Sequence, residues 1–414
     1  MEKTILVLPY TPTLSHISRP LEIAKQLERN DLQILFAGYK TQKSKIAFIE
    51  NEGFPCIPLF EPNPDILFNN IRQGNLNFVD NNTLSKMIDE DIRLFKQLNP
   101  DLVLTDGRFS AMISTQICDI PHAAIVNASS TEYRSVPYIP MFRYPFLKSG
   151  FTKNINSLLD KINLKLEMAV FDTGMNSFNR ISKRLKLPVK VTATNCLAGK
   201  DITLLADIPE YFPIANQPKS YHYIGPITWK STGFTLPPKW WPVDKNRSGN
   251  IYITMGTTGE EKLFSEIYRL FKASEFTAIV TTGSQAGSFK TVPGKIYVED
   301  YLDGEMVLDA SDVVVCHGGN GTIYQALSMG KPVIGIPTIP DQTFNMRRVE
   351  ALGVGISIPM KKALKNPYII LQKVRYLIEH MDKFATNIKK IRKRIKQFSG
   401  ADMGAEIIQA YLTS

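Results

Sequence analysis

Two kinds of apolar pattern alternate over most of the 414 residues. Short continuous apolar runs predict buried strands, and stretches with apolar residues three or four positions apart predict amphipathic helices. In the first half the predicted strands are 4–8, 33–37, 56–59, 102–105, 123–126, 202–205 and 221–224. In the second half they are 251–254, 278–281, 296–298, 313–316, 333–336 and 355–358. Continuous apolar strands that alternate with helices indicate parallel sheets covered on both faces.

Two segments interrupt this alternation. Residues 131–185 begin with prolines and aromatic residues and continue as two helical stretches, and residues 227–249 are rich in Pro, Trp and Lys, as a connector is. We therefore predict an α/β protein of two doubly wound, Rossmann-like domains. The predicted parts are an N-terminal domain at 1–226, a linker at 227–249, a second domain at 250–396 and a last helix at 397–414 that returns to the N-terminal domain.

Such domains bind ligands beyond the carboxyl ends of their strands. Two domains that face each other across a cleft would hold two substrates, one on each side. That arrangement suits group transfer.

The positive charge of the chain is concentrated near its end. Residues 361–396 hold twelve Lys or Arg and two acidic residues, so this stretch accounts for the whole net charge of +10. A basic stretch can attract anionic lipid or nucleic acid. The simpler interpretation is a solvated helix face, because Ile391, Ile395 and Phe398 recur at helical spacing and would form one apolar stripe. Peripheral membrane contact through this stretch stays open as an alternative.

The cysteines and the N-terminus favour the cytoplasm. Cys56, Cys118, Cys196 and Cys316 lie in or beside apolar runs without a C-x-x-C pair, which is typical of buried free thiols in a reducing compartment. The first apolar run, residues 4–9, is too short for a signal-peptide core or a membrane span. We expect a soluble cytoplasmic protein.

Residues 313–327 carry the most informative motif. A buried strand, V-V-V-C, runs into His317 and a glycine-rich turn and then into a predicted helix. Gly318, Gly319 and Gly321 would let the backbone approach a ligand closely, and a helix N-terminus presents free amides with partial positive charge. A diphosphate is the natural guest, and His317 and Thr322 could donate further hydrogen bonds. A purely structural turn is the alternative.

A second polar cluster follows the next predicted strand. The sequence there reads P-T-I-P-D-Q-T-F-N, and it places Asp341 and Gln342 beyond the carboxyl end of that strand. Their acceptors and donors suit vicinal sugar hydroxyls. Asp341 could instead, or also, cap the following helix.

These motifs together resemble a known family. The segments H-G-G-N-G-T, Q-A-L, G-K-P and D-Q-T-F-N follow one another from His317 at the spacing of the donor-binding signature of the UDP-glycosyltransferase superfamily, glycosyltransferase family 1. Weaker matches are Y-I-G-P before the linker and M-G-T after the first strand of the second domain. The resemblance implies the GT-B fold and a bacterial-type enzyme that transfers a hexose from a nucleotide diphosphate sugar to a small molecule, with inversion.

The resemblance also implies roles for individual residues. The diphosphate and nucleotide would be held by Gly256, Thr257, Tyr301, His317, Gly318, Gly319, Asn320, Gly321, Thr322 and Gln325. The sugar would be held by Asp341 and Gln342. Gln325 stands where the family has a ribose-binding Glu, and a neutral amide binds hydroxyls less strongly than a carboxylate. The base-binding stretch 298–305 lacks the family's proline near Asp303, so the sequence leaves open whether the donor is UDP-glucose-like or a dTDP-sugar.

A candidate base lies in the first domain. Inverting transfer needs an acceptor hydroxyl deprotonated as it attacks, and histidine suits this role. Of the five histidines, His16 follows the first strand in a segment, S-H-I-S-R-P, that resembles the family's G-H-x-x-P. Asp106 ends another strand where the family's His-orienting Asp falls. The alternative for Asp106 is a helix cap before Arg108.

The acceptor is expected against the first domain. The aromatic and proline-rich segment 133–151 could wall an apolar pocket with Tyr133, Tyr138, Phe142 and Phe146, or it could be a packed loop. No H-E-x-x-H, Cys/His cluster or D-x-D pair indicates a metal, so we expect metal-independent transfer without a cofactor.

Three other functions remain as alternatives. A nucleic-acid-binding protein would need basic residues along the cleft. A catalytically silent sugar-nucleotide-binding protein would not need His16 and Asp106. A nucleotide-sugar epimerase or hydrolase would consume donor without an acceptor. We expect a nucleotide sugar and a small hydrophobic acceptor as partners, and no nucleic acid.

Overall fold

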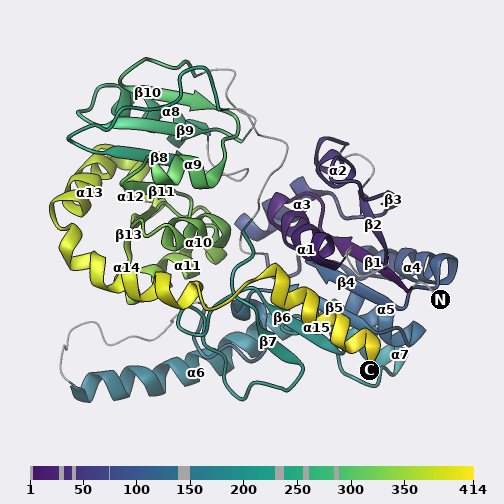
Figure 1. The fold of residues 1–414 in the computed structure, drawn as a ribbon. Coiled ribbons are helices and arrows are strands. Elements are labelled where there is room, and N and C mark those ends of the chain that lie inside the picture. The colour runs from purple at the N-terminus through teal and green to yellow at the C-terminus, as the bar shows by residue number, and fades with distance from the viewer. Residues whose placement is uncertain are drawn as a thin grey trace. The chain divides into compact units, whose positions relative to one another are not determined.

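The computed structural model describes residues 3–27, 32–39, 43–73, 75–138, 150–228, 237–254, 261–283 and 289–414. The chain forms two compact units (Figure 1). Unit 1 comprises Met1–Trp229 and Phe398–Ser414, and unit 2 comprises Lys230–Gln397.

Unit 1 is built on a parallel sheet whose described strands run in the order β3-β2-β1-β4-β5-β6-β7. These strands are β1 Thr4–Pro9, β2 Gln33–Tyr39, β3 Cys56–Leu59, β4 Leu102–Asp106, β5 His122–Val126, β6 Ile202–Leu205 and β7 Tyr221–Tyr223. The helices are α1 Leu14–Leu27, α2 Lys43–Glu50, α3 Pro64–Arg72, α4 Asn81–Leu98, α5 Ala111–Cys118, α6 Gly150–Gly174, α7 Asn176–Leu185 and α15 Ala401–Thr413.

Both faces of this sheet are buried. Successive strand residues point to opposite sides, so each strand contributes to the clusters on both faces. Ile5 and Val7 of β1 belong to one hydrophobic cluster, with α1 and α15. Leu6 and Leu8 belong to another, with Leu94 of α4. The covered faces explain why these strands read as continuous apolar runs.

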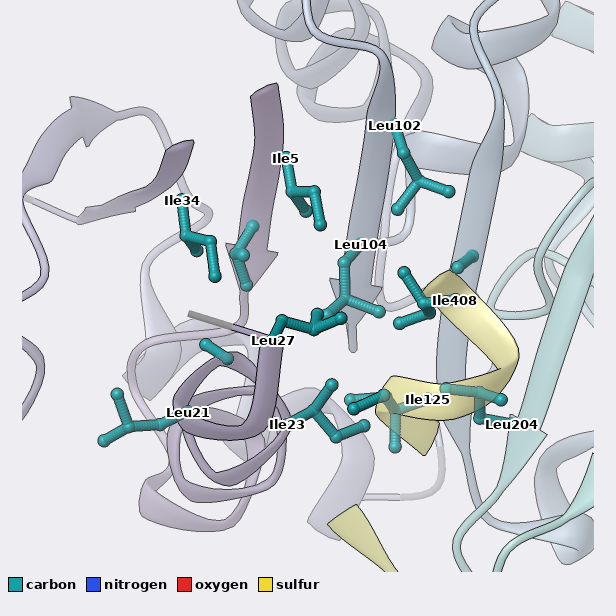
Figure 2. Close-up of a cluster of buried hydrophobic side chains, with 14 of the residues drawn as sticks. Ile5, Leu21, Ile23, Leu27, Ile34, Leu102, Leu104, Ile125, Leu204 and Ile408 are labelled. Carbon is teal, nitrogen blue, oxygen red and sulfur yellow. The ribbon is translucent and has the colours of Figure 1, made fainter. Parts of the chain in front are cut away.

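The last helix of the chain completes the first of these clusters. Ile408 of α15 is fully buried and lies beside Ile125 and Leu204 of the sheet (Figure 2). Gly404 allows the close approach of α15, since a Cβ at this position would lie 2.7 Å from the Ile23 Cδ1 atom of α1. The C-terminal residues therefore help to build the core of unit 1.

Unit 2 repeats the plan with a parallel sheet in the order β10-β9-β8-β11-β12-β13. The strands are β8 Asn250–Thr254, β9 Thr277–Thr281, β10 Ile296–Glu299, β11 Val313–Cys316, β12 Val333–Gly335 and β13 Gly355–Ser357. The helices are α8 Glu261–Lys272, α9 Gly304–Asp309, α10 Asn320–Ser328, α11 Pro340–Ala351, α12 Met360–Lys365, α13 Tyr368–Glu379 and α14 Met381–Ile395. The two sheets confirm the predicted parallel α/β class.

Each sheet has a point where the strand order reverses. In unit 1 it lies between β1 and β4, and in unit 2 between β8 and β11. Loops diverge to opposite faces at such a point and open a crevice at the carboxyl ends of the two strands. The predicted catalytic residues follow β1 and end β4, and the glycine turn follows β11.

One detail of the basic stretch differs from the prediction. Ile391 and Ile395 are buried on one face of α14, together with Ile388. Phe398 does not continue this stripe, because it lies in unit 1, where it packs on Gly225; a Cβ there would lie 2.2 Å from the Phe398 Cβ. The charged face of α14 has no large exposed aliphatic side chain, and among the described helices none is both long and apolar enough to cross a membrane.

Candidate active site

His16 and Asp106 lie in contact at the carboxyl edge of the sheet in unit 1. His16 is in the first turn of α1, directly after β1, and Asp106 is the last residue of β4, paired with Pro9 of β1. The Nδ1 atom of His16 hydrogen-bonds the Asp106 Oδ1 atom. Asp106 is fully buried, whereas the side chain of His16 is 31% exposed. Donation from Nδ1–H to the carboxylate leaves a lone pair on Nε2, as a general base requires.

Arg19 joins this pair, and sequence reasoning missed it. Its guanidinium donates from Nε to the Asp106 Oδ2 atom at 2.8 Å and from a terminal nitrogen to Oδ1 at 2.6 Å. The other terminal nitrogen donates to Asn127 Oδ1, just beyond β5, at 2.7 Å. The available signal was spacing, because Arg19 and His16 are three residues apart and so share one face of α1. The bidentate pair fixes the orientation of the buried carboxylate.

Gly107 makes room for the imidazole. Its φ is +80°, and a Cβ there would lie 3.2 Å from the His16 Nδ1 atom and 3.0 Å from the Tyr10 Cβ. The ring of Tyr10 stands edge-on to that of His16, with centroids 6.0 Å apart. The helix-capping alternative for Asp106 does not hold, because Ser110 takes the N-cap position of α5.

Glu61 is a second buried acid near this edge that the sequence did not indicate. It is 1% exposed and accepts hydrogen bonds from the Thr11 amide at 3.2 Å and the Thr11 hydroxyl at 2.9 Å. Burial raises the pKa of Glu61 to about 7, against the nearby positive charge of Arg108. Arg108 itself is paired with buried Asp91 at 2.7 Å.

The glycine turn of unit 2 joins β11 to α10. Gly318 has a φ of +89°, and a Cβ there would lie 3.2 Å from the Gln342 carbonyl oxygen. Gly319 is the N-cap residue of α10 and has no side chain to cap the first amides. Around Gly321 a Cβ would meet no atom of the described residues within 4 Å. The first amides of α10 therefore point to a position that an anion could fill.

Two side chains at this turn have buried polar atoms without partners among the described residues: Nδ1 of His317, and both Nδ2 and Oδ1 of Asn320. Unsatisfied buried polar atoms cost free energy and are rare. Desolvation lowers the pKa of His317 to about 4, so the ring is neutral at pH 7 and carries one N–H. A ligand with oxygen acceptors would satisfy Nδ2 of Asn320, and also Nδ1 of His317 when the single N–H of the ring is on that atom. Oδ1 of Asn320 would accept from a donor of the ligand.

Asp341 and Gln342 begin α11, beyond the end of β12. Gln342 is buried, and its side-chain oxygen accepts from the amide and the hydroxyl of Thr338, both at 2.8 Å. Asn345 donates to the Gly318 carbonyl at 3.0 Å and to the Asp341 carboxylate at 3.3 Å. These bonds join the start of α11 to the glycine turn, so both predicted sugar-binding residues lie beside the predicted diphosphate site.

The other predicted nucleotide-binding residues are only partly described. Gln325 of α10 packs on the start of α9, where a Cβ at Gly304 would lie 3.3 Å from its Nε2 atom. Tyr301 precedes α9, whose N-cap is Asp303. Thr322 is in the first turn of α10. Gly256 and Thr257 lie outside the described residues.

Two of the four predicted acceptor-binding aromatics are described, and they pack on different elements. The ring of Tyr133 packs on Tyr221 of β7 at 5.1 Å between centroids, and that of Tyr138 on Phe171 of α6 at 6.3 Å. Phe142 and Phe146 lie outside the described residues. No group of three or more His, Cys, Asp or Glu side chains within the described ranges is arranged to hold a metal ion.

Most of the sequence is similar to proteins of known class. It is 31% identical over 359 residues to a PGL/p-HBAD biosynthesis rhamnosyltransferase of Mycobacterium bovis, and the match covers 86% of this chain and 76% of that protein. The chain belongs to glycosyltransferase family 1. Residues 272–394 of this glycosyltransferase also match the family described as erythromycin biosynthesis protein CIII-like, C-terminal domain.

Solved structures show the same fold. A spinosyn rhamnosyltransferase complexed with spinosyn aglycone has a TM-score of 0.69 at 16% identity, with 98% of this chain and 99% of that chain covered. A Streptomyces glycosyltransferase complexed with thymidine diphosphate has a TM-score of 0.65 at 16% identity, with 99% and 100% covered. The predicted GT-B fold of this family 1 enzyme is thereby confirmed.

Proposed function

We propose that this glycosyltransferase moves a hexose from a nucleotide diphosphate sugar to a hydroxyl of a small apolar acceptor, with inversion and without a metal. The observation that carries the proposal is the contact of His16 with buried Asp106 at the strand-order reversal of unit 1. A histidine with its Nδ1 fixed on a carboxylate presents Nε2 as a base.

The transfer is a single displacement. Nε2 of His16 takes the proton of the acceptor hydroxyl as the acceptor oxygen attacks the anomeric carbon. The bond from that carbon to the diphosphate oxygen breaks, and its electron pair leaves with the diphosphate. Asp106 and Arg19 hold the ring while it becomes an imidazolium.

The leaving diphosphate is stabilised by the start of α10. The uncapped amides from Gly319 onward, the N–H of neutral His317 and the side chain of Asn320 supply donors for its oxygens. Asp341 and Gln342 would hold the sugar hydroxyls. Transfer by this route requires His16 and the glycine turn to reach the same sugar when both substrates are bound.

The identity of the donor nucleotide and sugar is a separate, narrower proposal. The M. bovis relative is named a rhamnosyltransferase, and a solved neighbour holds thymidine diphosphate. These names favour a dTDP-sugar such as dTDP-rhamnose over UDP-glucose. Gln325 on the predicted ribose side fits either nucleotide.

A donor screen followed by a transfer assay tests the proposal. UDP, dTDP and their sugars are compared by thermal shift, where a ligand at about 100 times its dissociation constant adds about 2.7 kcal/mol to the free energy of unfolding. The stabilising donor is then incubated with a panel of apolar alcohols and phenols, with and without a chelator, and the anomeric configuration of any product is determined by NMR. We expect an inverted product whose yield the chelator does not change.

Three results would contradict the proposal. Donor consumed at the same rate without acceptor would indicate a hydrolase or epimerase. Donor binding without transfer to any acceptor would indicate a silent binder. Failure of every nucleotide to stabilise the protein, with salt-sensitive binding of DNA, would indicate a nucleic-acid-binding protein.

A further inference from the structure

The helices α6 and α7 of unit 1 carry an unusual share of exposed aliphatic side chains. Of the ten large hydrophobic residues that are exposed among those described, six fall between residues 158 and 189. Scattered exposed apolar residues need no explanation, whereas a contiguous group indicates a contact surface. They are Leu158, Ile162, Leu166, Val170, Leu185 and Val189, with exposures of 61, 44, 44, 49, 39 and 46%.

Four of them form a ridge along α6, the long teal helix of unit 1 in Figure 1. Leu158, Ile162, Leu166 and Val170 follow one another at intervals of four residues, so they lie on one side of the helix. The opposite side faces the protein, where Glu167 is buried and accepts from Arg134 at 2.6 Å. The inward side also carries partly buried Leu164 and Met168, so the helix has apolar residues on both sides. The aliphatic ridge is therefore not needed to attach α6 to unit 1 and stays exposed beside Lys161 and Lys165.

Charge of one sign borders the ridge. Residues 158–190 contain seven Lys or Arg, and all seven are exposed: Lys161, Lys165, Arg180, Lys183, Arg184, Lys186 and Lys190. The three acids of the same segment are Asp160, Glu167 and Asp172, and none of them is in the exposed class. An exposed surface that combines aliphatic side chains with cations complements the surface of an anionic bilayer.

A hollow adjoins the C-terminal end of the ridge. It has a volume of about 650 Å³ and is lined by Ala169 and Thr173 of α6 and by Lys183, Lys186 and Lys190, with Asn176, Asn179 and Ser182 supplying further polar groups. Asp172 is the acid in its wall, and its carboxylate accepts from the Thr194 amide at 3.2 Å and hydroxyl at 3.1 Å. Three ammonium groups and several hydrogen-bond donors around one hollow suit a phosphate group.

We propose that this surface, residues 158–190, docks the enzyme on a membrane of anionic phospholipid. The aliphatic ridge enters the boundary between headgroups and acyl chains, and the lysines of the hollow bind lipid phosphate. The basic stretch 361–396 is the weaker candidate, because Ile388, Ile391 and Ile395 of α14 are buried and leave charge without exposed aliphatic side chains. This inference is independent of the catalytic roles of His16 and Asp106.

Vesicle cosedimentation tests the proposal on the full chain. Vesicles of phosphatidylcholine with phosphatidylglycerol are compared with phosphatidylcholine alone. We expect binding to the anionic vesicles, a loss of at least about tenfold in the variant Ile162→Gln/Leu166→Gln, and a similar loss with weaker salt dependence in Lys183→Gln/Lys186→Gln/Lys190→Gln. The matched control Lys389→Gln/Lys390→Gln/Lys393→Gln removes the same charge from α14 and should bind within about twofold of wild type.

Thermal melting checks that each variant is folded, and exclusion chromatography follows its oligomeric state. Failure of the folded wild type to bind anionic vesicles would overturn the proposal. So would equal binding by the α6 variant, or loss of binding only in the α14 control. An oligomer of the wild type that dissociates in the α6 variant would assign the ridge to a second copy of the chain instead.

Discussion

Each sheet has a polar cluster at its strand-order reversal: His16, Arg19 and Asp106 in unit 1, and His317 and Asn320 in unit 2. The two clusters differ in how many of their polar atoms are hydrogen-bonded within the protein. In unit 1, Asp106 is bonded by both His16 and Arg19, and Arg19 is bonded in turn by Asn127. In unit 2, Asn320 and His317 have buried polar atoms without partners among the described residues. The Asp106 carboxylate is fully bonded without a ligand, whereas a ligand would supply the missing partners at the second cluster. This difference fits a base that must be oriented before reaction and a donor site that receives charge.

The largest expected effect comes from breaking the complete cluster. In Asp106→Asn the amide cannot neutralise Arg19 or hold the Nδ1–H tautomer of His16, so we expect the transfer rate to fall by about 10²–10⁴. The free energy of unfolding should fall by about 3 kcal/mol because a buried guanidinium loses its partner. Steady-state kinetics and urea unfolding measure both effects. The control Asp119→Asn changes a fully exposed carboxylate and should leave both unchanged.

Two histidines extend the comparison to stability. His122 is buried, and its Nε2 and Nδ1 atoms are bonded to the Thr105 hydroxyl at 2.9 Å and the Lys200 amide at 3.2 Å. We expect His122→Gln to lower the free energy of unfolding by about 1–3 kcal/mol, because two buried groups lose their partner. His317→Gln should change it less, because His317 has one backbone hydrogen bond, to Thr254, and its Nδ1 atom has no partner within the described residues. Urea unfolding at neutral pH compares them, and equal losses would contradict the account.

The same histidines predict acid sensitivity. Burial lowers the pKa of His122 to about 3, and desolvation lowers that of His317 to about 4. Their pKa values in the unfolded chain are near 6.5. Between the folded and the unfolded pKa values, the unfolded state therefore binds more protons than the folded state. The contribution of the two neutral histidines to the free energy of unfolding should therefore be fully present above about pH 6.5. It should fall as the pH drops from about 6.5 towards the folded pKa values. Urea unfolding of wild type and His122→Gln at several pH values should show a smaller loss in the variant.

A smaller effect is expected at the incomplete cluster. Asn320→Ala removes polar atoms that form no bonds within the described residues, so the stability of the free protein should not fall. Donor binding should weaken about tenfold, because the ligand loses a hydrogen-bonding group. Titration with nucleotide and thermal melting without it separate the two. Ser328→Ala, at the other end of α10, serves as the control. Destabilisation of the free protein without loss of binding would mean that Asn320 has a structural role.

The smallest effect concerns Gln325. A carboxylate accepts stronger hydrogen bonds from ribose hydroxyls than an amide does, and the side chain lies beside the start of α9. We expect Gln325→Glu to tighten donor binding by about threefold to tenfold. Calorimetric titration with UDP and dTDP measures this, and weaker binding of both would argue against a ribose contact.

The sequence predicted the parts of the site that follow single strands. His317 comes directly after buried strand β11, and the glycines between it and α10 mark the turn. His16 lies in the helix that follows β1, where the segment S-H-I-S-R-P was the signal. Arg19 was missed although it lies three residues from His16, because its partner Asp106 is distant in the chain and only the β1–β4 pairing brings them together. Glu61 was missed for the same reason, since its hydrogen-bond partner Thr11 lies 50 residues away in the chain.

Two further features depend on tertiary packing and could not be predicted from the sequence pattern. Phe398 continues the spacing of Ile391 and Ile395, yet α14 ends at Ile395 and Phe398 packs on Gly225 in unit 1. The exposed ridge of α6 reads in the sequence as an ordinary apolar helix face. The exposures of the ridge and the buried bond of Glu167 to Arg134 show which side of the helix faces outward. Helical periodicity predicts an apolar stripe along a helix, but it does not show whether that stripe faces the core or the solvent.

The central claim is that His16 acts as the base while the start of α10 holds the donor. Single-turnover transfer by His16→Ala with saturating donor and acceptor, together with calorimetric titration of the free nucleotide, tests it most directly. We predict a rate reduced by about 10²–10⁴ and an unchanged dissociation constant for the nucleotide. A rate within about twofold of wild type, or nucleotide binding lost together with transfer, would contradict the account.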